Sequence, residues 1–171
     1  MHRLQPDDAV ARADEAETLL RRAQAALAPF PRLAAAGFLH DAEKEYAEAR
    51  LTPGLVAGST LVDAQSMGVG LAAWLNGLAE AASELRRHLL DRLRAGEQDR
   101  GEELLRAMED VYDVLVTIEY PDAITGGLRR TTDALRAVVE RSRSDLTTTA
   151  LQTKLQRAIE ERLGPQDLPS S

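Results

Sequence analysis

The sequence contains no cysteine, which excludes disulfide bonds, thiolate zinc sites and cysteine nucleophiles together. Aromatic residues are only 4% of the 171 residues, so leucine, alanine and valine must build any core. No apolar run approaches the roughly 20 residues that a membrane-spanning helix needs, and no segment resembles a signal peptide. We therefore expect a cytoplasmic protein without a membrane segment, folded as a single helical domain over residues 1–171.

Lysine is nearly absent as well. Lys44 and Lys154 are the only lysines, so arginine carries almost all of the positive charge. The net charge of -7 argues against nonspecific binding of duplex nucleic acid, which depends on neutralising phosphates. A local basic surface remains open, because Arg86-Arg87 and Arg129-Arg130 are adjacent pairs that could receive a phosphate. The alternative is that these arginines are simply solvated.

Apolar residues recur at helical spacing throughout, and no strand pattern or internal repeat is present. Prolines and glycines mark the expected helix ends. We predict helices over about residues 6–28, 31–51, 71–95, 99–118, from 128 onward, and 145–163, with one further turn near residue 61. The prediction is an all-α protein, an antiparallel bundle of six to seven helices, with an ordered core over residues 6–164 and a tail over 165–171.

Two local expectations follow from this pattern. Thr52-Pro53-Gly54 should end the second helix, because proline and glycine disfavour a helix interior. The apolar side of that helix is expected to carry Leu39, Ala42, Tyr46 and Ala49.

Four glutamates are the main sign of chemistry. Glu45 and Glu48 are three residues apart, and Glu80 and Glu84 are four apart, so each pair projects from one face of its helix. Like charges at this spacing repel, and a bound cation would reverse the sign of that interaction. Hard divalent ions such as Mg²⁺ bind oxygen ligands, so these acids from two facing helices suffice to hold one or two ions and to activate water.

An ordinary solvated surface explains the same residues. At about 100° per residue, Glu80 and Glu84 share a stripe with Arg87 and Asp91, opposite the leucines of their helix. A site on such a stripe needs another subunit or a neighbouring helix for enclosure.

The glutamates of the preceding helix also have an ordinary interpretation. Glu48 could merely pair with Lys44, four residues before it. Glu45 differs, because Phe38, Ala42 and Ala49 place it at the edge of the expected apolar stripe, where an unused carboxylate is costly.

Several short segments follow one another in a distinctive order along the chain. They are Glu45-Tyr46-Ala47-Glu48-Ala49, Leu78-Ala79-Glu80-Ala81-Ala82-Ser83-Glu84-Leu85, Met108-Glu109 with Tyr112, Tyr120-Pro121, and Leu128-Arg129-Arg130 with Asp133. In order and spacing they resemble the translin family, and the resemblance extends from about Ala9 to Leu163.

The glutamates resemble one branch of that family more than the other. Translin, the nucleic-acid-binding branch, is apolar where this chain has Glu80, whereas translin-associated factor X, the catalytic branch, is acidic at all four positions. The resemblance implies a helical subunit of a hollow homo-oligomer, typically an octamer, that cleaves single-stranded RNA with Mg²⁺ or Mn²⁺. By position, Glu45, Glu48 and Glu80 would bind the metal and orient the attacking water. Glu84 would be a fourth ligand or would support the others.

The chain departs from this pattern in two respects. Glu80 stands where the catalytic branch usually has aspartate, and one extra methylene can move a ligand by about 1 Å. The basic and aromatic run that translin carries near the Glu45 region is mostly missing, which leaves Phe38, Tyr46 and Trp74 as rings that could stack on bases. A low affinity for RNA is expected.

Three functions remain open at this point. A metal-dependent endoribonuclease requires the acids. A non-catalytic oligomer that binds single-stranded RNA or single-stranded DNA would be indifferent to metal and to the glutamates. An all-α nucleotide pyrophosphatase, which also uses Glu-x-x-Glu with a second acidic pair, would act on free nucleoside triphosphates.

Overall fold

The computed structural model describes residues 6–163, and every regular element within them is an α-helix. The helices are α1 (Pro6–Leu27), α2 (Pro31–Ala34), α3 (Phe38–Ala57), α4 (Ala64–Met67), α5 (Leu71–Arg94), α6 (Gln98–Val116), α7 (Asp122–Thr125) and α8 (Leu128–Leu163). Five of these are long, and α2, α4 and α7 are single turns. The predicted all-α bundle is confirmed, and the predicted tail at 165–171 lies outside the described residues.

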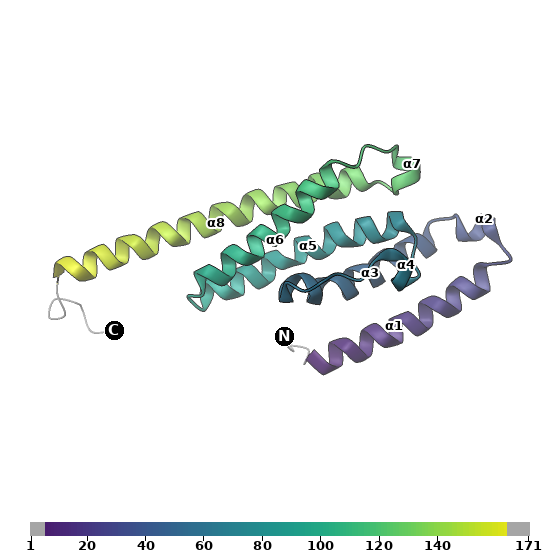
Figure 1. The fold of residues 1–171 in the computed structure, drawn as a ribbon, viewed down its shortest axis with the longest axis horizontal. Helices are drawn as coiled ribbons and strands as arrows, with labels where there is room; N and C mark the ends of the chain where they lie inside the picture. The colour runs from purple at the N-terminus through teal and green to yellow at the C-terminus, as the bar shows by residue number, and fades with distance from the viewer. Residues whose placement is uncertain (1–5, 164–171) are drawn as a thin grey trace.

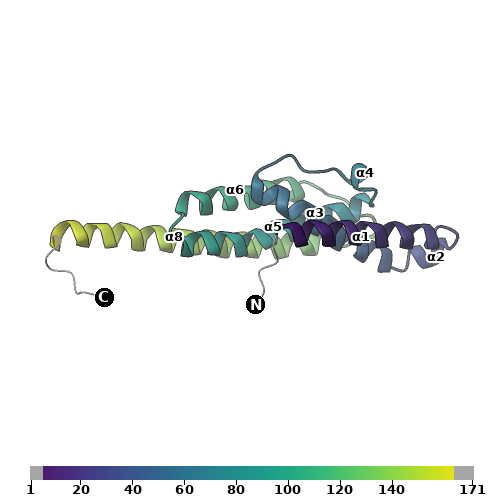
Figure 2. The same ribbon diagram turned by 90° about the horizontal axis from the view of Figure 1, so that it is seen from below.

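Helix α5 is the central element of the bundle. It packs against α3 on one side and against α6 and α8 on the other, while α1 lies along the outer side of α3 (Figures 1 and 2). The neighbours α1 and α3, α5 and α6, and α6 and α8 are antiparallel, whereas α5 and α8 run in the same direction (Figure 1). Helices α3 and α5 also run in the same direction, because the segment 58–70 carries the chain back before α5 begins (Figure 1). As a result, the first turns of α5, around Gly77, lie against the middle of α3, around Ala47.

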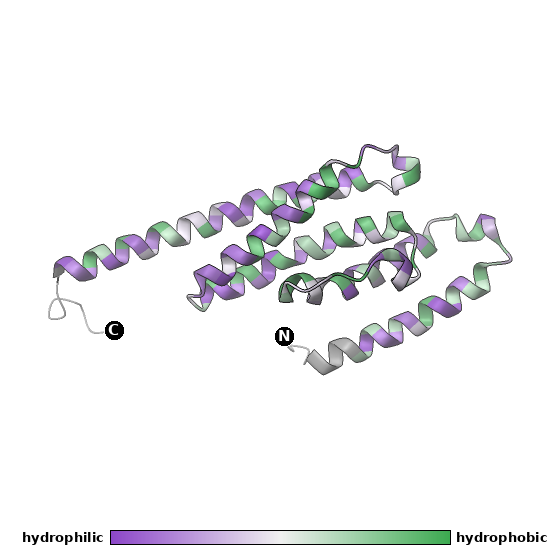
Figure 3. Cartoon of the chain, viewed as in Figure 1, coloured by the Kyte–Doolittle hydropathy of each residue, from purple (hydrophilic) through white to green (hydrophobic). Residues whose placement is uncertain are grey.

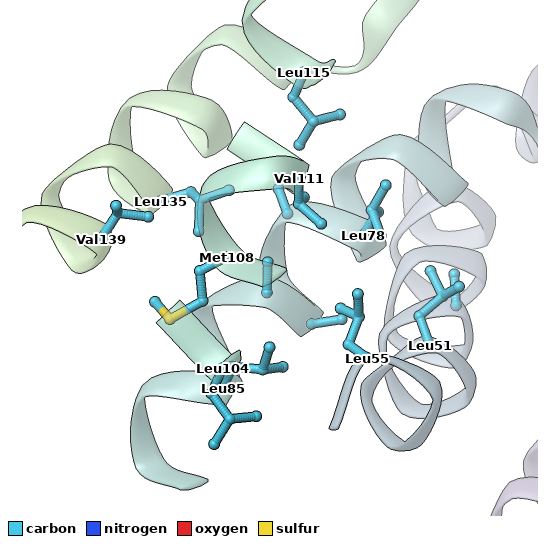
Figure 4. Packing of buried hydrophobic residues seen from close by; sticks show 14 of the residues in the cluster. Leu51, Leu55, Leu78, Leu85, Leu104, Met108, Val111, Leu115, Leu135 and Val139 are labelled. Carbon is cyan, nitrogen blue, oxygen red and sulfur yellow. The ribbon is translucent and has the colours of Figure 1, made fainter. Parts of the chain in front are cut away.

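Leucines from four helices form the core. Leu51 and Leu55 of α3, Leu78 and Leu85 of α5, and residues of α6 and α8 point toward one another (Figure 4). Leu85 and Leu89 are fully buried, at a spacing of four that keeps them on one face of α5. Burying such a side chain stabilises the fold by about 2 kcal/mol, so this seam orients α5 within the bundle.

Helix α3 continues through Pro53, where the sequence predicted its end. Proline lacks the N–H that bonds to the carbonyl four residues earlier, which normally weakens a helix. The Thr52 hydroxyl nevertheless donates a hydrogen bond to Glu48 O at 2.8 Å, and Leu55, two residues past the proline, is buried in the core. The predicted end at residues 52–54 is wrong because burial of the next turn offsets the local cost.

The start of α3 also differs from the prediction. A helix beginning at Pro31 was expected, but α2 ends at Ala34, and Gly37 adopts φ 100° before α3 begins at Phe38. A positive φ of this kind is open to glycine and strained for other residues, so Gly37 separates the two helices.

Helix α8 is one continuous helix of 36 residues, where the sequence predicted one helix from residue 128 and another from about 145. No glycine or proline occurs between Leu128 and Leu163, so no local signal breaks it. Its second half extends beyond the other helices in both views, and hydrophobic and hydrophilic residues alternate along it (Figures 1 to 3).

Among residues 6–163, no helix combines the length and the apolar character needed to cross a membrane.

Candidate metal centre

Helices α3 and α5 approach so closely at Gly77 that their backbones touch. A Cβ atom added to Gly77 would lie 2.7 Å from the carbonyl oxygen of Lys44, 2.8 Å from Ala47 Cβ and 3.0 Å from Glu48 N. Real Cβ atoms do not make contacts this short, so only glycine permits the observed spacing. Ala47 and Ala81 are fully buried small residues nearby on the two helices.

This close approach brings three carboxylates together. Glu45 and Glu48 extend from α3 and Glu80 from α5, and one oxygen of each lies within 4.8 Å of the other two. Two ligands on opposite sides of one ion stand about 4 Å apart for Mg²⁺ and about 5 Å apart for Ca²⁺. Small side-chain rotations would therefore let these oxygens share one divalent ion.

The three carboxylates differ in exposure. The Glu45 side chain is 68% exposed and that of Glu80 is 32% exposed, while Glu48 is half-buried. The cluster is thus closed by α3 and α5 on one side and open to solvent at Glu45. Additional ligands such as waters can enter from that open side, as Mg²⁺ sites require.

Two expectations about these positions are corrected. Ala42 and Ala49 are exposed and Phe38 is 79% exposed, so Glu45 does not border an apolar core face. The buried side of α3 carries Tyr46, Ala47, Leu51 and Leu55 instead. Glu80 does not lie on a fully solvated stripe either, because the parallel packing of α3 covers that turn of α5.

Lys44 is the positive charge in the cluster. Its Nζ lies 2.9 Å from Glu80 Oε1 and 3.4 Å from Glu45 Oε1, and its side chain is only 21% exposed. The pair between Lys44 and Glu48 considered from spacing is not formed, since the ammonium points across to α5. The hydrogen bond to Glu80 raises the pKa of Lys44, so it stays charged.

Glu48 has the most perturbed carboxyl group. Burial raises the pKa of Glu48 to about 7, and the like charges of Glu80, Glu45 and Glu84 act in the same direction, while Lys44 opposes them. A carboxylate held in such a place gains from any cation that joins the cluster. The carboxyl group most costly to ionise is therefore also the one that would benefit most from a metal ion.

Glu84 lies outside the cluster. It is exposed, and it is not among the three residues whose oxygens come together. It acts on Glu48 only as a nearby like charge. The structure thus separates the four sequence candidates into three converging carboxylates and one outlying acid.

The four candidate arginines are dispersed. Arg86 points to the opposite side of α5, where it forms an ion pair of 2.7 Å with Asp145 and donates to the Ser142 hydroxyl at 3.2 Å. Arg87, Arg129 and Arg130 are exposed, and within residues 6–163 they form no ion pair. Arg86 is thus committed to the bundle, and the other three are free to contact a ligand.

The three candidate stacking rings also differ. Tyr46 is buried and donates its hydroxyl proton to Glu17 at 2.8 Å, so it cannot stack on a base. Trp74 is half-buried, with its indole N–H bound to Val62 O at 2.9 Å. Phe38 alone presents an open ring face.

Sequence reasoning missed Gly77 and the role of Lys44. A lone glycine within the alanine-rich helical run of residues 71–85 was the available signal, because such a glycine commonly marks a close backbone contact. Nothing in the local sequence indicated that Lys44 would reach α5.

Comparisons with known proteins are consistent with the fold. No protein-family model matches the chain. A segment of 86 residues is 29% identical to an uncharacterized protein of Methanocaldococcus jannaschii; it covers half of this chain and 38% of that protein. The match thus spans well under half the length of this curated relative.

Two solved structures are similar over most of the chain. The structure of AfC3PO in complex with duplex RNA is 30% identical, with a TM-score of 0.68 over 84% of this chain and 78% of that one. A crystal structure of AfC3PO has the same identity and coverage and a TM-score of 0.67. AfC3PO is a complex of the translin type. Because sequence identity and fold agree across most of both chains, this protein belongs to the translin family.

Proposed function

We propose that this chain is an endoribonuclease of the translin-associated factor X branch, dependent on Mg²⁺ or Mn²⁺, with its active site between α3 and α5. The observation that carries the proposal is the convergence of Glu45, Glu48 and Glu80 within 4.8 Å, from two helices held in contact by Gly77. Three carboxylate oxygens are ligands that suit a hard divalent ion.

The similarity to AfC3PO supports RNA as the ligand. That protein is found in complex with duplex RNA. For this chain we propose single-stranded RNA as the substrate, because a flexible strand can bring a scissile phosphate to carboxylates that lie beside two helices. Glu80 favours assignment of this chain to the catalytic branch, because translin has an apolar residue at that position.

Each residue has a distinct role in the proposed reaction. Glu45, Glu48 and Glu80 would bind the ion, and Glu48, the more enclosed partner on α3, would also orient the attacking water and accept its proton. A divalent ion, when bound, supplies Lewis-acid activation of water and neutralises charge that develops on the phosphate. Arg87, Arg129 and Arg130 are exposed and available to the RNA backbone.

Assembly belongs to the same proposal. The cluster is open to solvent at Glu45, and an open carboxylate site in water is weakened by solvent screening. A hollow homo-oligomer, which we propose to be an octamer in the cytoplasm, would enclose the carboxylates and admit only strands that can thread inside.

The decisive experiment is RNA cleavage by the purified protein. Incubation with labelled single-stranded RNA and Mg²⁺ or Mn²⁺ should give cuts that EDTA stops and that Glu48→Gln reduces by at least about a hundredfold, as expected for loss of a group that acts on the reacting water. Glu102→Gln, an exposed acid on α6, is the matched control and should cut normally.

Other outcomes identify the alternatives. Unchanged cutting by Glu48→Gln refutes the assignment. Binding of single-stranded RNA or DNA without cutting, indifferent to metal and to the glutamates, would identify a non-catalytic oligomer. Hydrolysis of free nucleoside triphosphates would instead identify a pyrophosphatase.

A further inference from the structure

Lys44 occupies the position among the carboxylates that a cation would take. Its Nζ is 2.9 Å from Glu80 Oε1 and 3.4 Å from Glu45 Oε1, so it bridges the same two helices that the proposed metal would bridge. The side chain is only 21% exposed, which keeps the ammonium inside the cluster.

The identity of the residue matters. Only two lysines occur in the chain, against a combined 21 lysines and arginines, so position 44 departs from the strong preference for arginine. An ammonium is a compact point charge on a flexible stem, whereas a guanidinium is a planar fork. The compact group fits between carboxylates and can move away without disturbing the backbone.

An ion and the ammonium compete for the same oxygens. A divalent ion held by Glu80 and Glu45 would need the oxygens that now bind the ammonium, and two positive charges among these carboxylates would repel. Both cannot occupy their best positions together. Once displaced from Glu80, the ammonium could remain near Glu45 or turn into the solvent at the open side of the cluster.

We propose that Lys44 is a built-in counter-cation that a divalent ion must displace, so that Lys44 sets the threshold of metal concentration for occupancy of the site. The proposal rests on the proposed function in one respect: the ion binds the same three carboxylates. Lys44 therefore neutralises part of the charge on the carboxylates at low metal concentration, and it moves toward solvent when the ion arrives.

Metal titration of charge-matched variants tests the displacement. Lys44→Gln should bind Mn²⁺ about tenfold more tightly than the native chain, measured by electron paramagnetic resonance of free Mn²⁺, because a competing unit charge has been removed. Lys154→Gln removes the same charge from an exposed position on α8 and should bind as the native chain does. Lys44→Arg, which keeps the charge, should bind Mn²⁺ no more tightly than the native chain.

A second measurement needs no substitution and so does not depend on whether a variant folds. Because the chain contains two lysines, ¹³C-lysine labelling yields two ε-methylene signals. Addition of Mg²⁺ should shift the Lys44 signal toward the position of a solvated lysine and leave Lys154 unchanged. A Lys44 signal that stays constant while Mg²⁺ saturates the site would overturn the proposal.

The results separate this inference from the nuclease. Equal Mn²⁺ affinity in Lys44→Gln and Lys154→Gln, with RNA still cut, overturns the role of Lys44 alone. Tighter binding in Lys44→Gln that is lost on adding Glu48→Gln, with no RNA cut by any form, supports Lys44 and overturns the nuclease. Absence of Mn²⁺ binding in every form overturns both.

Discussion

Glu48 is the glutamate of the cluster whose ionisation destabilises the folded chain most. Burial and three like charges raise its pKa to about 7, well above the ordinary value of 4.5. For an acid whose pKa is higher in the folded state than in the unfolded state, the folded state binds the proton more tightly. The contribution of Glu48 to the free energy of unfolding is therefore fully present below its unfolded pKa of 4.5 and is lost as pH rises through its folded pKa of about 7.

This relation predicts how Glu48→Gln affects stability without added metal. Glutamine resembles the protonated acid, so the variant should be about as stable as the native chain near pH 4.5. As pH rises to 8 the native chain loses stability and the variant does not, so the variant becomes the more stable of the two. We expect a difference of about 1 kcal/mol at pH 8, after discounting the shift for the solvent exposure of the group. Urea unfolding with EDTA at both pH values measures it.

Urea unfolding in the presence of Mg²⁺ should favour the native chain instead of the Glu48→Gln variant. Mg²⁺ should stabilise the native chain at pH 8 more than it stabilises Glu48→Gln, because a bound ion relieves the repulsion that the substitution also removes. A native chain that is as stable as the variant at pH 8 without metal would contradict the assigned environment of Glu48.

The contrast between Glu80 and Glu84 gives a second prediction at this scale. Both lie on α5, but only Glu80 joins the cluster. Glu80→Gln should weaken Mn²⁺ binding by at least about tenfold, or about 1.4 kcal/mol, since a ligand is lost. Glu84→Gln should weaken it only about twofold, because an exposed charge outside the cluster is screened. Isothermal titration of the two variants measures both; equal losses would make Glu84 a ligand.

At the scale of elements, the site depends on the contact between α3 and α5. Gly77 lets the two backbones touch, and one oxygen each of Glu45, Glu48 and Glu80 lies within 4.8 Å of the other two. Neither helix alone could gather three carboxylates, because one helical face offers positions only every three or four residues. The carboxylate cluster is thus a property of the pair.

Gly77→Ala should disrupt that pair. The added methyl group would meet backbone atoms at 2.7 Å and 3.0 Å, which cannot rotate away, so α5 must shift from α3. We expect a loss of about 2 kcal/mol in the free energy of unfolding, despite the better helix propensity of alanine. Mn²⁺ affinity should fall in parallel, measured by urea unfolding and titration.

Gly101→Ala on α6 provides the control. Its added methyl group would meet only the ends of leucine side chains, at 3.1 Å and 3.3 Å, and these can adjust. The variant should stay within about 1 kcal/mol of the native chain and bind Mn²⁺ normally. Equal effects of the two substitutions would show that the contact at Gly77 has no special importance.

At the scale of the whole molecule, α8 is longer than the bundle it joins. Leu151, Leu155 and Ile159 are 61%, 61% and 42% exposed, and their spacing of four places them on one face. A shallow hollow of about 320 Å³ lies beside Leu155 and Ile159. Within residues 6–163, no other helix covers this face at the projecting end (Figure 1).

The proposed oligomer predicts that a second copy of the chain covers this face. Leu155→Glu should lower the molar mass in solution, measured by light scattering after size-exclusion chromatography, because a charge would enter an apolar contact. Lys154→Glu, on another face of the same turn, should leave the mass unchanged. A native chain that is monomeric at micromolar concentration would contradict the assembly.

Much of the fold could be predicted from local sequence. Helical spacing of leucines and alanines predicted helices in all five long regions, although α8 was predicted as two helices and both ends of α3 were misplaced. Two errors occurred where tertiary contacts outweighed local preference. Helix α3 continues through Pro53 because Leu55 is buried beyond it, and Tyr46, placed correctly on the apolar side of α3, cannot act as a stacking ring because it is buried and bound to Glu17. Propensity cannot register burial by a partner that is distant in sequence.

For the site, the sequence by itself determined the candidates. Glu45, Glu48 and Glu80 were identifiable because carboxylates at helical spacing share a face, whatever surrounds them. Only the tertiary structure decided that Glu80 joins the pair on α3, that Glu84 does not, and that Lys44 lies between them. The physical reason is that a shared cation position depends on distances of a few ångströms between helices, and these are set by packing at Gly77 and by the direction in which the chain returns.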